Sequence, residues 1–297
     1  MSLDSWPEVK DQIKDRLAII AGSGLLPLHV AQAARIHGEN PFIIALANES
    51  DRDWSSFDHT TLGIGNFKAI SGVFRDAGIG RVVMSGAVRR RPDWRDIKPT
   101  LRSLAKVPSV LRTLLSGGDD AVLKMAIELI ETNGARVIGV QEIVPELLAD
   151  VGTLGRCSPG TEDQADIEAA EAAAIALGHL DVGQGAVAVG GRVVALEGPE
   201  GTDAMLERVA KLKADGRISS RRRGVLVKLC KPQQDLRADL PSVGPSTIKG
   251  AQAAGLAGIA VEAGRALVLE RAEMIKLADD AGLFIAGIDR ALLRGMR

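Results

Sequence analysis

The sequence contains no tyrosine, and aromatic residues of all kinds make up only 3% of its 297 residues. Proteins that bind single-stranded nucleic acid stack its bases on aromatic side chains, so the composition argues against that class. The formal net charge is −1 and no long basic block is present, which also argues against binding along a nucleic-acid backbone. We therefore expect no nucleic-acid partner.

Cysteine and histidine are scarce as well, with two and four residues. The cysteines, Cys157 and Cys230, lie far apart, and none of the spacings CxxC, HxH or HExxH occurs. We therefore expect neither a disulfide framework nor a zinc site. No apolar run is long enough to span a bilayer, and the N-terminus lacks the basic and then apolar plan of a signal peptide. These features favour a cytoplasmic protein.

Apolar residues make up 46% of the chain, and a chain of this length predicts two domains of the α/β class. Residues 1–16 are polar, and we interpret them as a natural extension or an expression remnant outside the fold. Residues 17–150 alternate short apolar strands with helical patterns, which predicts a Rossmann-like domain with a parallel sheet. After a linker at 151–163, residues 164–297 predict a mixed α/β catalytic domain, with a hairpin at 185–196.

A glycine turn follows the first predicted strand and opens a helix; it consists of Gly22, Ser23 and Gly24. Backbone N–H groups at such a turn and the positive end of the helix can face a phosphate. Pro27 occupies the place of the third glycine of the dinucleotide fingerprint, so a nicotinamide cofactor is poorly supported. A plain tight turn with a proline in the first helical turn explains the same residues.

The most informative segment is densely charged; it begins near the end of the apolar run from Gly224 to Cys230 and continues beyond it. It includes the side chains of Lys228, Lys231, Gln233, Gln234, Asp235, Arg237 and Asp239, and three prolines between positions 232 and 245 stiffen its backbone. Asp235 and Asp239 are four residues apart, a spacing that places both carboxylates on one face. Two carboxylates beside several cations can hold a divalent metal and a phosphate together. A solvated loop with surface ion pairs is the alternative.

Other polar residues could line a pocket. Gln141 and Glu142 end a predicted parallel strand, where ligand crevices form. Gln184 precedes the hairpin, although a turn explains it. Thr202 and Asp203 could bind substrate, although a helix N-cap explains either of them, and Thr161 with Gln164 predicts a capping box at an earlier helix.

Three consecutive arginines precede the apolar run, at positions 221–223. The cluster is short, so we interpret it as a solvated turn or, at most, as a contact for one anionic group.

Several of these segments together resemble the UDP-2,3-diacylglucosamine pyrophosphatases of lipid A biosynthesis, in the family distinct from the calcineurin-like phosphoesterase version. The resemblance runs from about Leu17 to the C-terminus and is most specific in the C-terminal motifs. The segments that carry it are Leu17–Pro27, Gly139–Glu142, Asp181–Gln184, Val194–Gly198, Glu200–Leu206, Gly224–Lys228, Lys231–Pro241 and Gly244–Thr247.

The resemblance implies a magnesium-dependent hydrolase that cleaves UDP-2,3-diacylglucosamine into UMP and 2,3-diacylglucosamine 1-phosphate (lipid X). It also implies two domains that hold the substrate, a homodimer, and a critical aspartate in the C-terminal domain. We match that aspartate to Asp235 first and to Asp239 second. A cytoplasmic enzyme of this pathway could also contact the inner face of the inner membrane.

The expected roles follow from phosphoryl-transfer chemistry, which needs an aligned water and cations against the phosphate charge. Asp235 would bind magnesium or the attacking water, and Asp239 would be a second ligand or a supporting carboxylate. Lys228, Lys231 and Arg237 would neutralise the phosphates, and the glycine turn would contact uridine or phosphate. The competing functions are a nicotinamide-dependent oxidoreductase and a non-catalytic nucleotide-sugar sensor.

Overall fold

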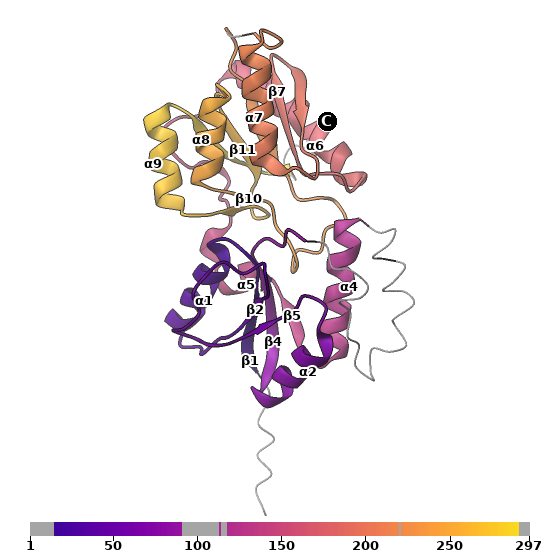
Figure 1. The fold of residues 1–297 in the computed structure, drawn as a ribbon. Helices are drawn as coiled ribbons and strands as arrows, with labels where there is room; N and C mark the ends of the chain where they lie inside the picture. Colours follow the sequence, from indigo (N-terminus) through magenta and orange to yellow (C-terminus); the bar gives the residue numbers. More distant parts are fainter. Residues whose placement is uncertain (1–14, 91–112, 114–117, 220, 291–297) are drawn as a thin grey trace, which may run out of the picture. The chain divides into compact units, whose positions relative to one another are not determined.

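The computed structural model describes residues 15–90, 113, 118–219 and 221–290 (Figure 1). The chain divides into two compact units, one of Met1–Leu115 and Met125–Ile138 and the other of Ser116–Lys124 and Gly139–Arg297. Nearly all of the N-terminal extension lies outside the described residues.

The first unit is built on a parallel five-stranded sheet, as predicted for a Rossmann-like domain (Figure 1). Its strand order is β3 (Asp58–Leu62), β2 (Phe42–Leu46), β1 (Arg16–Ala21), β4 (Ile79–Ser85) and β5 (Arg136–Ile138). Its strands alternate with α1 (Leu26–Ile36), α2 (Phe67–Asp76) and α4 (Asp119–Thr132). The sequence analysis missed β3, because its residues Asp-His-Thr-Thr-Leu form a largely polar edge strand.

The second unit contains a mixed six-stranded sheet, which confirms the predicted class. Its order is β6 (Gly152–Thr153), β13 (Phe284–Ile288), β11 (Gly258–Glu262), β9 (Val225–Lys228), β7 (Gly185–Val189) and β8 (Arg192–Leu196). The three strands β13, β11 and β9 are parallel, and β6, β7 and β8 pair antiparallel. The segment predicted as a linker, 151–163, contributes β6 to this sheet and the first turn of a helix, since a two-residue strand leaves no periodic pattern to detect.

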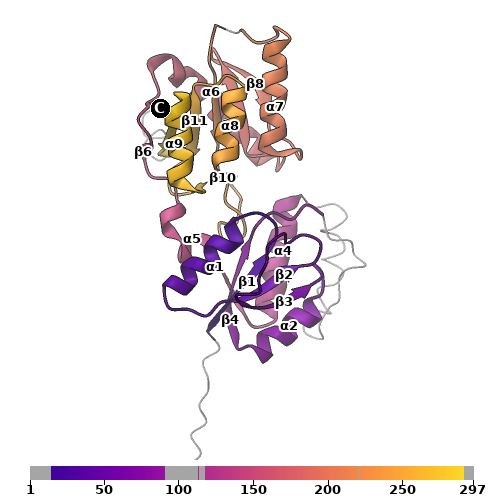
Figure 2. The ribbon, with the colours of Figure 1, turned by 60° about the vertical axis from the view of Figure 1, so that its left-hand side comes forward.

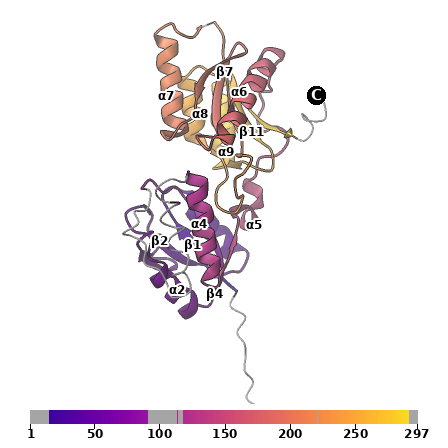
Figure 3. The same cartoon turned by 90° about the vertical axis from the view of Figure 1, so that its right-hand side faces the viewer.

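Helices cover both faces of this sheet (Figures 2 and 3). The three helices α7 (Gly201–Ala214), α8 (Pro245–Ala253) and α9 (Arg271–Ala281) share one core with the sheet, and α6 (Thr161–His179) packs on the opposite face. A separate parallel pair joins β10 (Ser242–Val243) to β12 (Leu267–Val268). The central strands read as continuous apolar runs because both of their faces are buried.

The predicted helix caps are wrong in two places. Helix α6 begins after Gly160, whose N–H donates to the carboxylate of Asp163 at 2.8 Å, so the Thr161 and Gln164 capping box does not form. Helix α7 begins at Gly201 after Glu200 without a side-chain cap, so neither Thr202 nor Asp203 is the N-cap. The Thr202 hydroxyl has other partners, and they belong to the candidate site.

A core substitution tests this architecture. Leu226 on β9 is 0% exposed, so we expect Leu226→Ala to destabilise the second unit by about 2–5 kcal/mol, through lost burial and the cavity that it leaves. Leu180, 73% exposed in the same unit, provides the control, and Leu180→Ala should change stability by less than about 0.5 kcal/mol. Urea unfolding measures the stability of both variants. Equal urea midpoints for Leu226→Ala and Leu180→Ala would contradict the assigned core.

Candidate active site

Lys228 ends strand β9 with its charge buried, since the residue is only 5% exposed. Its Nζ donates to the Thr202 hydroxyl at 2.7 Å and to the Ser242 carbonyl oxygen at 3.2 Å. The Glu197 carboxylate lies 3.8 Å from the same Nζ and supplies the opposite charge. A buried ammonium group requires such partners, because an unpaired charge is costly away from water.

Glu197 organises this cluster, although the sequence analysis did not select it. It directly follows β8, is 6% exposed, and accepts hydrogen bonds from the Thr202 hydroxyl at 2.5 Å and the Gln184 N–H at 3.2 Å. A side chain at Gly185 would collide with this carboxylate, which explains the glycine there. The predicted residues Gln184 and Thr202 are therefore brought to Lys228, whereas Asp203 is exposed in the first turn of α7.

The charged segment after β9 folds around Gln234. Its Oε1 accepts the Lys231 N–H at 3.0 Å, and its Nε2 donates to Asp239 Oδ2 at 2.7 Å. Burial raises the pKa of Asp239 above its usual value, while Lys228, Lys231 and the Gln234 hydrogen bond act in the opposite direction. Asp239 is therefore a desolvated carboxyl whose ionisation depends on nearby cations.

Asp235 has a different environment in the same turn. Its carboxylate accepts hydrogen bonds from the Arg237 side chain at 3.0 and 2.7 Å and from the Arg237 N–H at 3.0 Å. These hydrogen bonds hold the pKa of Asp235 below its usual value. The turn thus contains one carboxylate stabilised as an anion and a second, Asp239, pushed towards its neutral form.

The remaining polar residues of the segment are held by the region around the end of α6. Lys231 Nζ forms an ion pair with Asp181 at 2.6 Å, with both side chains largely buried. The Gln233 side chain donates to the Gly178 carbonyl oxygen at 2.6 Å. Asp181 has a positive φ of 54°, an uncommon conformation for a residue other than glycine. The Gln233 amide therefore has a structural role, and Lys231 is positioned by a carboxylate.

A second buried charge network supports the start of the segment. Glu262, at the end of β11, accepts the Cys230 N–H at 3.1 Å. The Arg290 guanidinium lies 3.4 Å from Glu262 and 3.7 Å from Glu171. Sequence analysis missed all three charged residues. Glu262 carried the same signal as Lys228, a charged residue that ends an apolar strand.

Gln141 and Glu142 lie in the short helix α5 (Val140–Ile143) and not at the end of a strand. Gln141 Nε2 donates to the Leu236 carbonyl oxygen at 3.2 Å, and its Oε1 is buried without a partner among the described residues. Gln141 therefore joins the charged segment. Glu142 accepts the Gly139 N–H at 2.9 Å and closes the first turn of α5.

The glycine turn in the first unit has protein contacts that account for its sequence. A Cβ at Gly22 would lie 2.5 Å from the Ala87 carbonyl oxygen, and Ser23 pairs with Ala87 through its backbone and hydroxyl. Gly24 has a φ of +96°, and its N–H donates to Asp51 at 3.0 Å. Close packing and a positive φ thus explain these residues, and phosphate contact remains a prediction.

The buried thiol of Cys230 reports on this site. Burial, followed by the nearby Glu262 charge, raises its pKa to about 12, so it should react slowly at pH 8, where the thiolate is scarce. A disulfide reagent should therefore modify Cys230 slowly in the Cys157→Ser variant and rapidly after unfolding. Glu262→Gln removes one charge that raises the pKa and should accelerate the native reaction, whereas Glu207→Gln, an exposed control on α7, should not. Fast modification of Cys230 in the otherwise unchanged protein would contradict its burial.

This chain resembles known proteins along nearly its whole length. A curated relative from Caulobacter vibrioides, named UDP-2,3-diacylglucosamine pyrophosphatase LpxI, is 41% identical over 275 residues, which cover 92% of this chain and 98% of the relative. Solved structures include Bordetella bronchiseptica WbmH with NAD+, at 16% identity, 39% coverage of this chain and 36% of that chain, with a TM-score of 0.24. Another is the UDP-glucose 4-epimerase of Thermus thermophilus with NAD, at 11% identity, 95% and 92% coverage and a TM-score of 0.30. Such TM-scores support no argument about fold or function.

The family comparison covers both units. The profile of the LpxI N-terminal domain matches residues 16–147, and the profile of the LpxI C-terminal domain matches residues 150–286. Together they span most of the chain, and the chain therefore belongs to the LpxI family.

Proposed function

We propose that this protein hydrolyses the pyrophosphate bond of UDP-2,3-diacylglucosamine and releases UMP and 2,3-diacylglucosamine 1-phosphate. The observation that carries this function is the 41% identity, over nearly the full length of both chains, to a relative named UDP-2,3-diacylglucosamine pyrophosphatase. The cations and carboxylates beyond β9 suit the chemistry, because a diphosphate needs positive charge around its oxygens and a positioned water.

In this proposal the cations bind the diphosphate. Lys228 and Lys231 are held by Glu197 and Asp181, so they are already oriented before the substrate arrives. Such preorganisation lowers the cost of reorganising charge during the reaction. Arg237 would leave Asp235 in part and offer its planar guanidinium to a phosphate, which it matches in geometry.

The carboxylates would hold Mg²⁺ and direct the water. No group of three or more His, Cys, Asp or Glu side chains suited to a metal occurs among the described residues. Mg²⁺ needs no such cluster, since it keeps several waters and binds through one or two carboxylates together with substrate phosphates. Asp235 and Asp239 fit that donor set, and a cation beside Asp239 would favour its ionised form. The metal would polarise the phosphate or the water.

Membrane contact and oligomeric state are two further aspects of the proposed function. In the stretches that the structure covers, we find no helix with the length and apolar character to cross a bilayer. Because the substrate carries acyl chains, we propose a cytoplasmic enzyme that meets its substrate at the inner face of the inner membrane. We also propose that it acts as a homodimer.

Product analysis in labelled water tests the function. We expect Mg²⁺-dependent release of UMP from UDP-2,3-diacylglucosamine, loss of release with EDTA, and one ¹⁸O atom from ¹⁸O-water in one of the two products. The labelled product identifies the phosphorus that water attacks, because the new P–O bond carries the label. Titration with NADH is the control for the competing oxidoreductase. Micromolar NADH binding without UMP release would refute the proposal.

Substitution of the two aspartates separates their roles. We expect Asp235→Asn and Asp239→Asn each to lower kcat by at least ~100-fold, as is typical for lost acid–base or metal-binding groups. Loss of a metal ligand in Asp235→Asn should also raise the Mg²⁺ concentration needed for half-maximal rate. Glu207→Gln, an exposed change on α7, should leave kcat within about two-fold.

The pH dependence identifies the role of Asp239. Since burial raises its pKa, the carboxyl is protonated at a higher pH than the ordinary value of 3.8, and activity should be lost on acidification above that value. This acid limb of kcat/KM should persist in Glu207→Gln and disappear from the residual activity of Asp239→Asn. An unchanged limb in Asp239→Asn, or near-normal turnover, would exclude Asp239 as the ionising group.

A further inference from the structure

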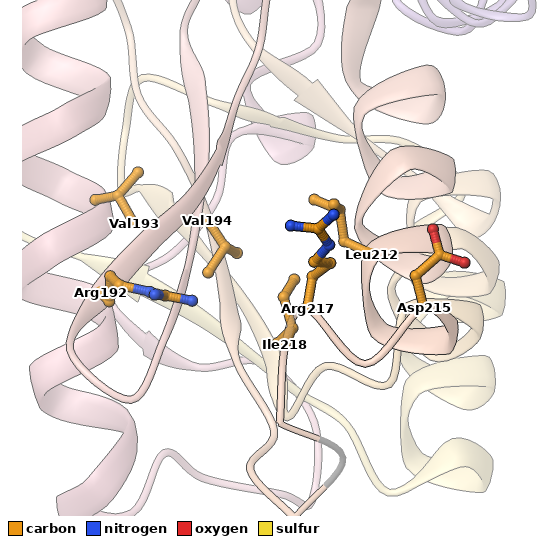
Figure 4. Close-up of a pocket in the computed structure, with 7 residues that line it drawn as sticks. All are labelled: Arg192, Val193, Val194, Leu212, Asp215, Arg217 and Ile218. Atoms are coloured by element: carbon orange, nitrogen blue, oxygen red, sulfur yellow. The ribbon is translucent and has the colours of Figure 1, made fainter.

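The second unit contains a cavity at the end of its sheet opposite to Lys228. In the β7–β8–β9 register, Lys228 pairs with Gly185, whereas Arg192 pairs with Val189 at the far end of the hairpin. The cavity has a volume of about 550 Å³ and lies between β8 and the end of α7 (Figure 4). Its lining residues are Arg192, Val193, Val194, Leu212, Asp215, Arg217 and Ile218.

Two arginines line this cavity from different segments. Figure 4 shows Arg192, from β8, with its guanidinium pointing towards the α7 side of the cavity, and the guanidinium of Arg217, from the segment after α7, beside Leu212. Within the described part of the chain, neither side chain forms a hydrogen bond or an ion pair. Both arginines are exposed to solvent, and an anion bound between their guanidinium groups would lower the repulsion between these like charges.

The arginine cluster of the sequence adds charge to the same end of the unit. Arg223 has a structural role, because its guanidinium donates to the carbonyl oxygens of Leu256 and Gly282. The Arg222 side chain instead lies against the hairpin turn, about 3.1 Å from where a Cβ of Gly190 would be. It therefore lies at the same end of the hairpin as Arg192, which follows that turn, and adds positive charge there.

The rest of the lining is mainly apolar. Ile218 is buried, and Val194 and Leu212 present aliphatic surface to the cavity. The exception is Asp215, whose carboxylate points away from the two guanidinium groups (Figure 4). Cations next to aliphatic side chains complement an anion attached to an apolar group. The guanidinium group matches phosphate in geometry, and the aliphatic side chains shield hydrocarbon from water.

We propose that this cavity is a second binding site, separate from the catalytic cluster, for a phosphate group carried on an apolar molecule. Arg192 and Arg217 bind the phosphate oxygens, and Val194, Leu212 and Ile218 contact the apolar part. The proposal does not depend on the function of the Lys228 cluster. A phospholipid headgroup and a soluble alkyl phosphate share this chemistry.

Binding of hexyl phosphate and inorganic phosphate tests the site, followed through the backbone amide signals of Val193, Val194 and Ile218. We expect saturable binding of hexyl phosphate, tighter than that of inorganic phosphate. The double variant Arg192→Gln/Arg217→Gln should weaken it by at least ~10-fold, because hydrogen bonds to charged groups contribute strongly. Arg156→Gln/Lys276→Gln removes the same charge from exposed positions of the same unit and should bind as tightly as the unaltered protein.

Vesicles of phosphatidylcholine with and without phosphatidylglycerol identify the source of the phosphate. If the protein co-sediments with the anionic vesicles and only the Arg192→Gln/Arg217→Gln variant loses this binding, the ligand is a lipid. Saturable hexyl phosphate binding without co-sedimentation indicates a soluble one. Equal weakening in both double variants, or shifts that do not saturate at the cavity amides, would overturn the proposal. Thermal unfolding verifies that each variant is folded.

Discussion

The candidate site depends on the burial of one positive charge, that of Lys228 at the end of β9. The ammonium group can stay there only because Glu197, Thr202 and the Ser242 carbonyl oxygen satisfy it. Each partner comes from a different element: the end of the β7–β8 hairpin, the first turn of α7 and strand β10. The requirement to satisfy one buried cation therefore fixes how three segments approach the end of the sheet, and the charged segment begins there.

The need to satisfy buried charge also explains why the two carboxylates of the segment, Asp235 and Asp239, differ. Asp235 is stabilised as an anion by hydrogen bonds from Arg237, and burial shifts Asp239 towards its neutral form. Environments that move two pKa values apart allow two identical groups to have different chemical roles. Asp239 gains most from an added cation, because its ionised form is opposed mainly by desolvation. A hydrolytic site that takes up a metal with its phosphates would use that difference.

The sequence was informative where chemistry is local. Lys228 could be selected because it ends an apolar strand, and the mixed sheet followed from strand patterns. Glu262 ends a strand in the same way and Glu197 directly follows one, but their roles depend on strand order and register, which the sequence does not reveal. The predicted N-cap at Thr202 was wrong for a related reason. Thr202 has the right residue type for an N-cap, yet its hydroxyl hydrogen-bonds with Lys228 and Glu197 instead. Tertiary demand for a hydrogen bond overrode the local preference.

The cations at the two ends of the second sheet differ in whether a carboxylate lies beside them, and this contrast has a physical basis. Around Lys228 each cation described here has a carboxylate beside it, so the charges hold a fixed geometry before any ligand binds. At the far end Arg192 and Arg217 line one cavity, and neither forms an ion pair with the residues that the structure describes. Paired cations suit a reaction in which position decides the rate. Unpaired ones suit reversible capture of an anion, because no existing ion pair must break, although water must still leave. The sheet thus separates a preorganised cluster from a surface whose charge is free to bind.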